Sequence, residues 1–467
     1  MTENLGSKHS SSGVVKSNQA GLSLGSSGLI PNNFGPYSLE ELGESLIQFN
    51  AQIIKIPNPQ AAEGAKSLMI TVSQPGPLVA LVPLIEELSS HPDCAEIAIF
   101  GADVGMQDFY KHPQLSKLEY SMVADITTLS TEDFFSSLLA HTAISAPSVV
   151  ITTNESILGP QLIMQCLAKK SLGAAFLVLV AESPDCSLGL PYELGLLNTY
   201  PEIAPIDLFL CNDELTESVV KFLVGDRSTA QVLVTGTGQL DSIYQTDTAR
   251  LRQSALEKLS LSGTEKCFLF LGDIAESYPI ESRIDLDLNN KSFEALLQAT
   301  SSLALMNPST EYRLLLRPHP RDARKDEISQ YSKCVLPSNI KITEAPSSRC
   351  TIDEASAITL AVLSTTRTEV FKAPLRGLEG IFLGLTQSDE LEGYGLGSQC
   401  LRLMAPPIQH VFSAPPKGLS LAKNSADILT ILDRVSKHSA KMAIPSNNPP
   451  TQSGKIMANA IFKIMSQ

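Results

Sequence analysis

The stretch LLLRPHPRDARKDE, residues 314–327, joins an apolar run to a basic turn. Leu314 to Leu316 predict a buried strand of a parallel sheet, where continuous apolar runs replace alternation. The prolines end the strand, stiffen the turn and push the residues before them into extended geometry. Such a turn, with His319 between Arg317 and Arg321, suits an anionic ligand. A solvent-facing turn with ordinary surface arginines explains these residues equally well.

Short apolar runs alternate with helical patterns from residue 67 onward. The runs of the first half are SLMITV (67–72), EIAIF (96–100), SVVIT (148–152), AAFLVLV (174–180), IDLFLC (206–211) and QVLVTG (231–236). The rhythm restarts with KCFLFLGD (266–273), YRLLLR (312–317), NIKIT (339–343), AITLAVL (357–363) and GIFLG (380–384). Strand–helix alternation predicts doubly wound parallel sheets. We therefore expect an α/β protein with two Rossmann-like domains.

These patterns divide the chain into four parts. Residues 1–66 are rich in Ser, Gly, Asn and Pro, and we expect a flexible N-terminal arm. Residues 67–240 and 241–435 form the two Rossmann-like domains, and residues 436–467 form a tail with a closing helix. A further helix is expected over 419–436, and Asp213 is the expected N-cap of a helix ending near residue 223. Two such domains facing each other make a cleft, which is a favoured place for a small-molecule site.

Composition excludes several classes of protein. The 467-residue chain has a formal charge of −14, whereas a general nucleic-acid binder would be basic. Its eight cysteines show no CxxC spacing, which indicates reduced core thiols rather than a disulfide framework or a zinc site. We find no secretory signal and no apolar run of transmembrane length. The sequence therefore predicts a cytoplasmic protein without a transmembrane segment, a nucleic-acid partner or a metal site.

Polar residues gather at the ends of strands in the second half. They are Gly272 and Asp273, then Arg317, His319 and Arg321, then Ser364, Thr365, Thr366 and Glu369. Four Lys or Arg residues lie within 317–325, opposed only by Asp322. Hydroxyls and amide groups at a helix start favour phosphate, and a carboxylate in its first turns suits ribose hydroxyls. The alternative is that Ser364 or Thr365 merely caps the helix, with Glu369 on a solvated face.

The motifs RPHP (317–320) and STTRTE (364–369) resemble those of the GT-B superfamily of nucleotide-sugar glycosyltransferases. The resemblance is to CDP-glycerol glycerophosphotransferases and to bacterial sialyl- and polysialyltransferases with an HP motif. It implies two Rossmann-like domains facing across a cleft, with His-Pro contacting the donor phosphates and the hydroxyl-rich turn and Glu369 holding phosphate and ribose. VTGTGQLD (234–241) resembles the turn between the two domains of that fold.

The loop after the first strand departs from the family pattern. It reads Ser73-Gln74-Pro75-Gly76-Pro77 and has no ionisable group, although Gly76 allows close backbone approach to a ligand. A transferase needs a base within hydrogen-bond reach of the acceptor hydroxyl. Our candidates for this base are Glu182 and Asp185, which follow the most apolar strand of the first half. The alternative is that each is a surface loop carboxylate.

The expected function is transfer of a sugar or polyol-phosphate from a CDP-, CMP- or UDP-linked donor to an acceptor hydroxyl. The acceptor would be a glycan or a lipid-linked molecule in cell-surface polysaccharide or glycan synthesis. A lipid-linked acceptor would bring the enzyme to the inner membrane face. We expect no tightly bound cofactor. The alternatives are a nucleotide-sugar epimerase or hydrolase on the same fold, and a nucleotide-binding scaffold protein without turnover.

Overall fold

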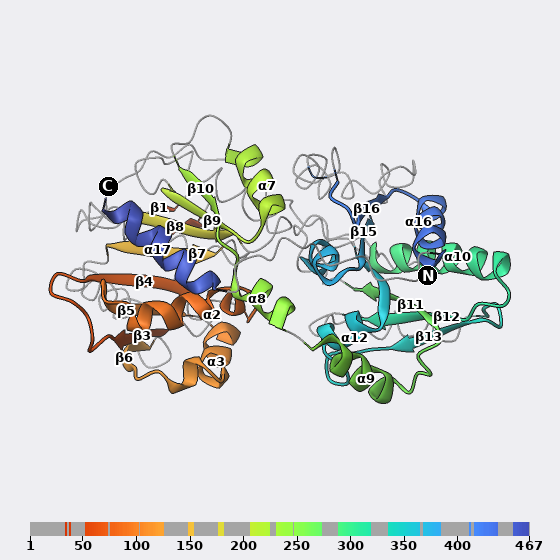
Figure 1. The fold of residues 1–467 in the computed structure, drawn as a ribbon, viewed down its shortest axis with the longest axis horizontal. Helices are drawn as coiled ribbons and strands as arrows, with labels where there is room; N and C mark the ends of the chain where they lie inside the picture. Colours follow the sequence, from red (N-terminus) through yellow and green to blue (C-terminus); the bar gives the residue numbers. More distant parts are fainter. Residues whose placement is uncertain are drawn as a thin grey trace, which may run out of the picture.

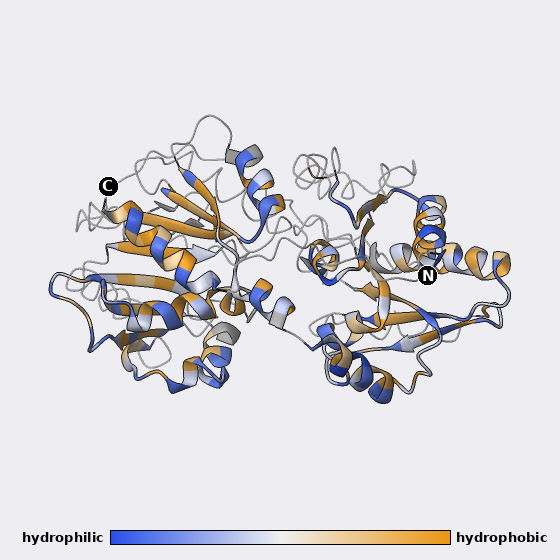
Figure 2. Ribbon diagram, viewed as in Figure 1, coloured by the Kyte–Doolittle hydropathy of each residue, from blue (hydrophilic) through white to orange (hydrophobic). Residues whose placement is uncertain are grey.

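The computed structural model contains two α/β lobes that lie side by side (Figure 1). It describes residues 33–34, 37–38, 52–72, 75–101, 103–125, 148–153, 176–181, 206–224, 230–245, 247–272, 288–318, 335–364, 368–383, 411, 415–437 and 452–466. Each lobe is built on its own sheet, and most strands of both sheets are hydrophobic (Figure 2). A separate short pair, β1 (Asn33–Phe34) and β2 (Tyr37–Ser38), precedes the first lobe.

The first sheet has the order β10-β9-β8-β7-β4-β5-β3-β6 in the described part of the chain. Its strands are β3 (Gln52–Pro57), β4 (Lys66–Val72), β5 (Cys94–Gly101), β6 (Ser121–Asp125), β7 (Val149–Thr153), β8 (Phe176–Ala181), β9 (Leu208–Cys211) and β10 (Gln231–Val234). Neighbouring strands are parallel except around β3, which runs antiparallel to β5 and β6. Along the chain, β4 is followed by β5 on one side of it and by β7 on its other side, so the switch in strand order lies between β4 and β7.

The strand β3 lies within residues 1–66, which the sequence analysis assigned to the flexible arm. Ile53, Ile54 and Ile56 are buried, and β3 pairs on both sides. The run QIIKIP is not followed by a helical pattern, so the strand–helix rhythm did not indicate it. Within the described residues, the first sheet thus begins at residue 52.

The second sheet has the order β13-β12-β11-β14-β15-β16, and all its described pairs are parallel. Its strands are β11 (Lys266–Leu271), β12 (Tyr312–Arg317), β13 (Ile340–Glu344), β14 (Thr359–Ser364), β15 (Glu379–Leu383) and β16 (Leu419–Ala422). Numbered along the chain, this is the Rossmann order 3-2-1-4-5-6. The switch in strand order lies between β11 and β14. The expected fold class, two doubly wound α/β domains, is confirmed.

Helices cover the faces of both sheets. The first lobe carries α2 (Pro75–Ser90), α3 (Asp103–Lys111), η1 (Leu115–Lys117), α7 (Glu214–Val224), α8 (Gly238–Gln245) and α17 (Ser453–Met465). The second carries α9 (Thr248–Leu259), α10 (Leu288–Met306), α12 (Ile352–Ala357), α13 (Thr368–Lys372), η7 (Ala373–Arg376) and α16 (Ser425–Lys437). The last helix, α17, returns to the first lobe and packs on α2 and α8 (Figure 1).

One helix boundary differs from the expected one. The helix expected over 419–436 is the strand β16 followed by α16. Leu419 to Ala422 pair with β15, and the Asn424 side chain accepts a hydrogen bond from the Asp427 N–H at 2.9 Å, so the helix starts only there. The expected domain boundary at 240–241 falls inside α8, which packs against α2. The expected N-cap is confirmed, because Asp213 accepts from the Thr216 N–H at 2.7 Å.

Candidate functional site

Three parallel strand ends of the second lobe bring predicted site residues together. The central strand β11 lies between β12 and β14, so Gly272, Arg317 and Ser364 share one edge of the sheet. The Gly272 N–H donates to the Arg317 carbonyl at 2.9 Å and extends the ladder past the strand. In open α/β sheets, the crevice outside the carboxyl ends at the switch point is where ligands bind. This edge is therefore the candidate nucleotide site.

The side chain of Arg317 is held by the protein itself. Its Nη1 donates to the carbonyls of Ala345 at 2.9 Å and Cys350 at 2.5 Å. These bonds fix the segment between β13 and α12 against the end of β12. The described contacts give Nη1 of this guanidinium a structural role, and the expected contribution of its charge to phosphate binding stays a prediction.

Ser364 is fully buried at the end of β14. Its hydroxyl donates to the Leu271 carbonyl of β11 at 2.9 Å. The hydroxyl thus ties together the two strands at the switch point. This bond has a structural role within the sheet, and the contact of Ser364 with a phosphate stays a prediction.

Glu369 belongs to an ion-pair network at the start of α13. Its carboxylate accepts from Arg376 Nη1 at 2.6 Å and lies 3.3 Å from the Lys372 Nζ. Arg376 Nη2 in turn lies 2.8 Å from Asp353 of α12. Burial would raise the pKa of Glu369, but Arg376 and Lys372 outweigh it and hold the pKa at about 2. Glu369 is therefore ionised at neutral pH and remains a hydrogen-bond acceptor.

Seven predicted site residues lie outside the described part of the chain. They are Glu182, Asp185, Asp273, His319, Arg321, Thr365 and Thr366. Five of them lie within two residues of the end of a described strand: Glu182 after β8, Asp273 after β11, His319 after β12, and Thr365 and Thr366 after β14. The ends of β12 and β14 are two strand spacings apart, about 10 Å. The predicted proximity of His319 and Thr365 rests on this arrangement.

The first lobe places Gly76 at the amino end of α2, directly beyond β4 and its switch point. Gly76 is exposed, and a Cβ added to it would meet no atom within 4 Å. The Gln239 Nε2 of α8 donates to the Gly76 carbonyl at 2.9 Å. Close approach of a ligand to the Gly76 backbone stays a prediction.

Buried polar groups run along the same edge of the first sheet. Thr71 and Thr152, on either side of the switch point, share a hydrogen bond at 2.9 Å, and both are buried. Further along, the Thr237 hydroxyl donates to the Asn212 Oδ1 at 2.6 Å. Burial raises the pKa of Asp213 despite its bonds from Thr216. Asp213 thus gives the edge a carboxylate that takes up a proton more readily than an exposed aspartate.

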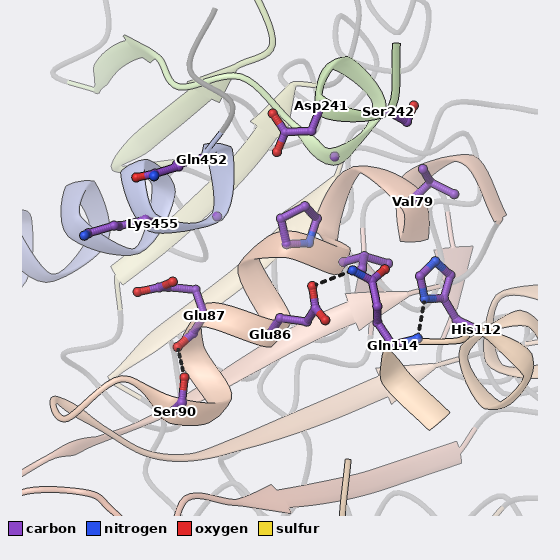
Figure 3. A pocket seen from close by; sticks show the side chains of 14 residues that line it. Val79, Glu86, Glu87, Ser90, His112, Gln114, Asp241, Ser242, Gln452 and Lys455 are labelled. Atoms are coloured by element: carbon purple, nitrogen blue, oxygen red, sulfur yellow. Dashed lines mark hydrogen bonds between the residues drawn. The ribbon is translucent and has the colours of Figure 1, made fainter. Parts of the chain in front are cut away.

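A polar cavity of about 590 Å³ lies elsewhere in the first lobe, on the outer face of α2 (Figure 3). Glu86 and Glu87 of α2, Asp241 of α8 and Lys455 of α17 line it. Burial lowers the pKa of His112, which also lines the cavity. None of the described candidate site residues contributes to the cavity, so we do not assign the candidate site to it.

Sequence reasoning missed the residues that hold the site in place. Lys372 follows Glu369 at a spacing of three in a helix, which is a recognisable ion-pair signal. Gln239 lies within VTGTGQLD, but its contact with Gly76, 163 residues earlier, has no local signal. Within the described residues, no three His, Cys, Asp or Glu side chains gather to hold a metal ion. No described helix is long and apolar enough to span a bilayer.

Known structures share this architecture almost from end to end. S. aureus MnaA, solved with UDP, is 14% identical, with a TM-score of 0.53, and the match covers 86% of this chain and 97% of MnaA. The UDP-GlcNAc 2-epimerase of Neisseria meningitidis, bound to UDP-GlcNAc, is 14% identical with a TM-score of 0.51, covering 85% and 100%. The UDP-GlcNAc 2-epimerase of Methanocaldococcus jannaschii is 13% identical with a TM-score of 0.51, covering 85% and 99%.

The chain has a GT-B-like fold. Identities of 13–14% establish the fold alone, so the superfamily and the branch to which the motifs point stay predictions. No protein-family model and no curated protein matches the sequence.

Proposed function

We propose that the protein is an enzyme acting on a UDP-linked sugar, with the nucleotide bound on the second lobe of the GT-B-like fold. The observation that carries the proposal is the second sheet's 3-2-1-4-5-6 order, which brings the ends of β11, β12 and β14 together. The likeness to structures solved with UDP and UDP-GlcNAc, over 97% and 100% of those chains, supports UDP as the nucleotide.

The predicted residues divide between the parts of such a substrate. His319 and Arg321 would contact the phosphates, with Thr365, Thr366, Gly272 and Asp273 beside them. Glu369, ionised and held by Arg376 and Lys372, would accept hydrogen bonds from the ribose hydroxyls. Gly76 would lie against the substrate from the first lobe, across the expected cleft. Glu182 and Asp185 are the proposed bases.

Two reactions fit a UDP-linked sugar on this fold. The likeness to UDP-GlcNAc 2-epimerases favours epimerisation at the sugar C2. The RPHP and STTRTE motifs favour transfer to an acceptor hydroxyl, as the sequence analysis proposed. We take epimerisation as the first reaction to test, because it needs no acceptor.

Proton NMR of UDP-GlcNAc incubated with the protein separates these reactions. Epimerisation yields the C2 epimer with its UDP still attached at equilibrium, hydrolysis yields free sugar and UDP, and transfer yields UDP only when an acceptor is added. Binding of UDP-GlcNAc or UDP without any product would support a scaffold protein. If calorimetry detects no binding of UDP, UDP-GlcNAc, CDP or CMP, the proposed function is wrong.

A further inference from the structure

A proline inside α2 marks the point at which two distant helices dock. Pro83 has no N–H, so the carbonyl of Val79 lacks its usual helical partner. Gly238 of α8 packs against this carbonyl: a Cβ at position 238 would stand 2.2 Å from the Val79 oxygen. Gly454 of α17 packs against α2 one helical turn after Val79, where a Cβ at position 454 would stand 2.1 Å from the Pro83 carbonyl oxygen. Neither position accepts a side chain, so both helices contact the α2 backbone directly.

Hydrogen bonds fix α8 both to α17 and to the amino end of α2. The Ser453 hydroxyl of α17 donates to the Asp241 Oδ2 at 2.7 Å, and both residues are buried. At the amino end of α2, the Gln239 side chain of α8 donates to the Gly76 carbonyl at 2.9 Å, and Gln239 is 8% exposed. Figure 3 shows the Asp241 carboxylate of α8 between α2 and α17. We call α2, α8 and α17 together the clamp.

The clamp holds the two helices that flank the second lobe in the chain. α8 is followed by α9, which belongs to the second lobe, and α17 is the described helix after α16 of that lobe. All three helices of the clamp pack on one another in the first lobe, so Gly76 and Gln239 lie on the same lobe.

The amino end of α2 has few groups with which to contact a ligand. The first amides of a helix have no helical acceptor, but Pro75 and Pro77 carry no N–H. Of the first four residues of α2, only Gly76 and Leu78 therefore carry a backbone N–H. The direction of the Gly76 N–H depends on the backbone dihedral angles at Gly76, and Gln239 restrains these by holding the Gly76 carbonyl.

We propose that Gln239 is a positioning residue, which orients the Gly76 peptide for contact with the nucleotide sugar while the clamp anchors α8. This inference rests on the proposed function, because Gly76 is a substrate contact there. Gln239 acts through the Gly76 carbonyl, to which its side chain donates.

Gln239→Met keeps the length of the side chain and removes its donor, and Ser453→Ala is the matched control that loosens the clamp without touching Gly76. Calorimetry with UDP-GlcNAc should show affinity about 5-fold weaker in Gln239→Met, the effect of one lost hydrogen bond, and unchanged in Ser453→Ala. Amide hydrogen exchange without nucleotide should be faster in Gln239→Met alone at Ala80, whose helical acceptor is the Gly76 carbonyl.

Two outcomes overturn the inference. Wild-type affinity and exchange in Gln239→Met would mean that this side chain does not orient the peptide. Equal losses in Ser453→Ala would mean that general loosening of α8 is responsible. Absence of UDP-GlcNAc binding in the wild-type protein is a separate result: it contradicts the proposed function, and with it the role of Gly76 as a substrate contact.

Discussion

The Ser453 hydroxyl donates a hydrogen bond to the Asp241 carboxylate at 2.7 Å, across 212 residues of sequence. It joins the last helix before the second lobe to the helix that follows that lobe. Asp241 is 8% exposed and Ser453 is fully buried, so water is largely kept from this bond. A carboxylate at such a position depends on the donor that the protein supplies.

Replacing Ser453 by Ala should lower the free energy of unfolding by about 1–3 kcal/mol, because a buried carboxylate oxygen loses its donor. Urea denaturation measures this loss. Ser466→Ala is the control at the other end of α17, where the exposed hydroxyl only donates to the Lys463 carbonyl at 2.7 Å. Equal losses in the two variants would contradict the structural role of the Asp241–Ser453 pair.

Glycine-to-alanine substitutions should have unequal effects at positions 454 and 76. Gly454→Ala puts a Cβ 2.1 Å from a backbone oxygen, so α17 has to shift and stability should fall by about 1–3 kcal/mol or more. Gly76→Ala meets no atom within 4 Å beyond its chain neighbours, and the gain in helix propensity is offset by the Pro77 ring, so stability should change by less than about 0.5 kcal/mol. Thermal melts of both variants test this contrast. A melting temperature that falls as far in Gly76→Ala as in Gly454→Ala would mean that the site is not open.

Removing the Glu369 charge should destabilise the second lobe in a pH-dependent way. The folded pKa of about 2 lies below the ordinary value of 4.5, so the ionised form is the one that folding favours. Its contribution, on the order of 3 kcal/mol, is complete above about pH 5 and is lost as the pH falls towards 2. The stability difference between wild type and Glu369→Gln should therefore be large at pH 7 and shrink below pH 5.

Glu354→Gln is the matched control for this prediction. Burial raises the pKa of Glu354, but hydrogen bonds from Lys258, Ser254 and Thr351 outweigh it and set the pKa at about 2. Its network joins α9 to α12 and includes no predicted site residue. Both variants should lose stability with the same pH dependence, whereas UDP affinity should fall only in Glu369→Gln. Equal UDP affinity in the two variants would contradict the ribose role of Glu369.

The fold was predictable wherever a strand forms a continuous apolar run. β12 matches the expected YRLLLR at both ends, since this strand is covered on both faces and its last residue, Arg317, precedes a proline. β6 gave no such signal, because Ser121 and Met122 are exposed at the sheet edge. The run beginning at Leu419 is apolar enough for either structure, and its pairing with β15 decides for a strand.

The candidate site was predictable at the level of strand ends but not of side-chain contacts. Strand order is what brings Gly272, Arg317 and Ser364 to one edge, and alternation in the sequence already implied a parallel sheet. The direction of the Arg317 side chain depends on carbonyls of the segment 345–350, which only the folded chain supplies. Ser364 likewise donates to a strand that lies 93 residues earlier in the sequence.

His319 and Arg317 should therefore respond differently to substitution, although both belong to the RPHP motif. His319→Ala should weaken UDP binding and lower the rate on the order of 10²-fold, with an unchanged melting temperature, because a lost transition-state donor costs about that much. Arg317→Lys should lower the melting temperature, since the flexible lysine ammonium does not reproduce the fixed Nη1 that donates to both Ala345 and Cys350. Affinity for UDP and melting temperature, measured together for both variants, check the contrast. An unchanged UDP affinity with a collapsed melting temperature in His319→Ala would make the whole turn structural and remove the main phosphate contact of the proposed site.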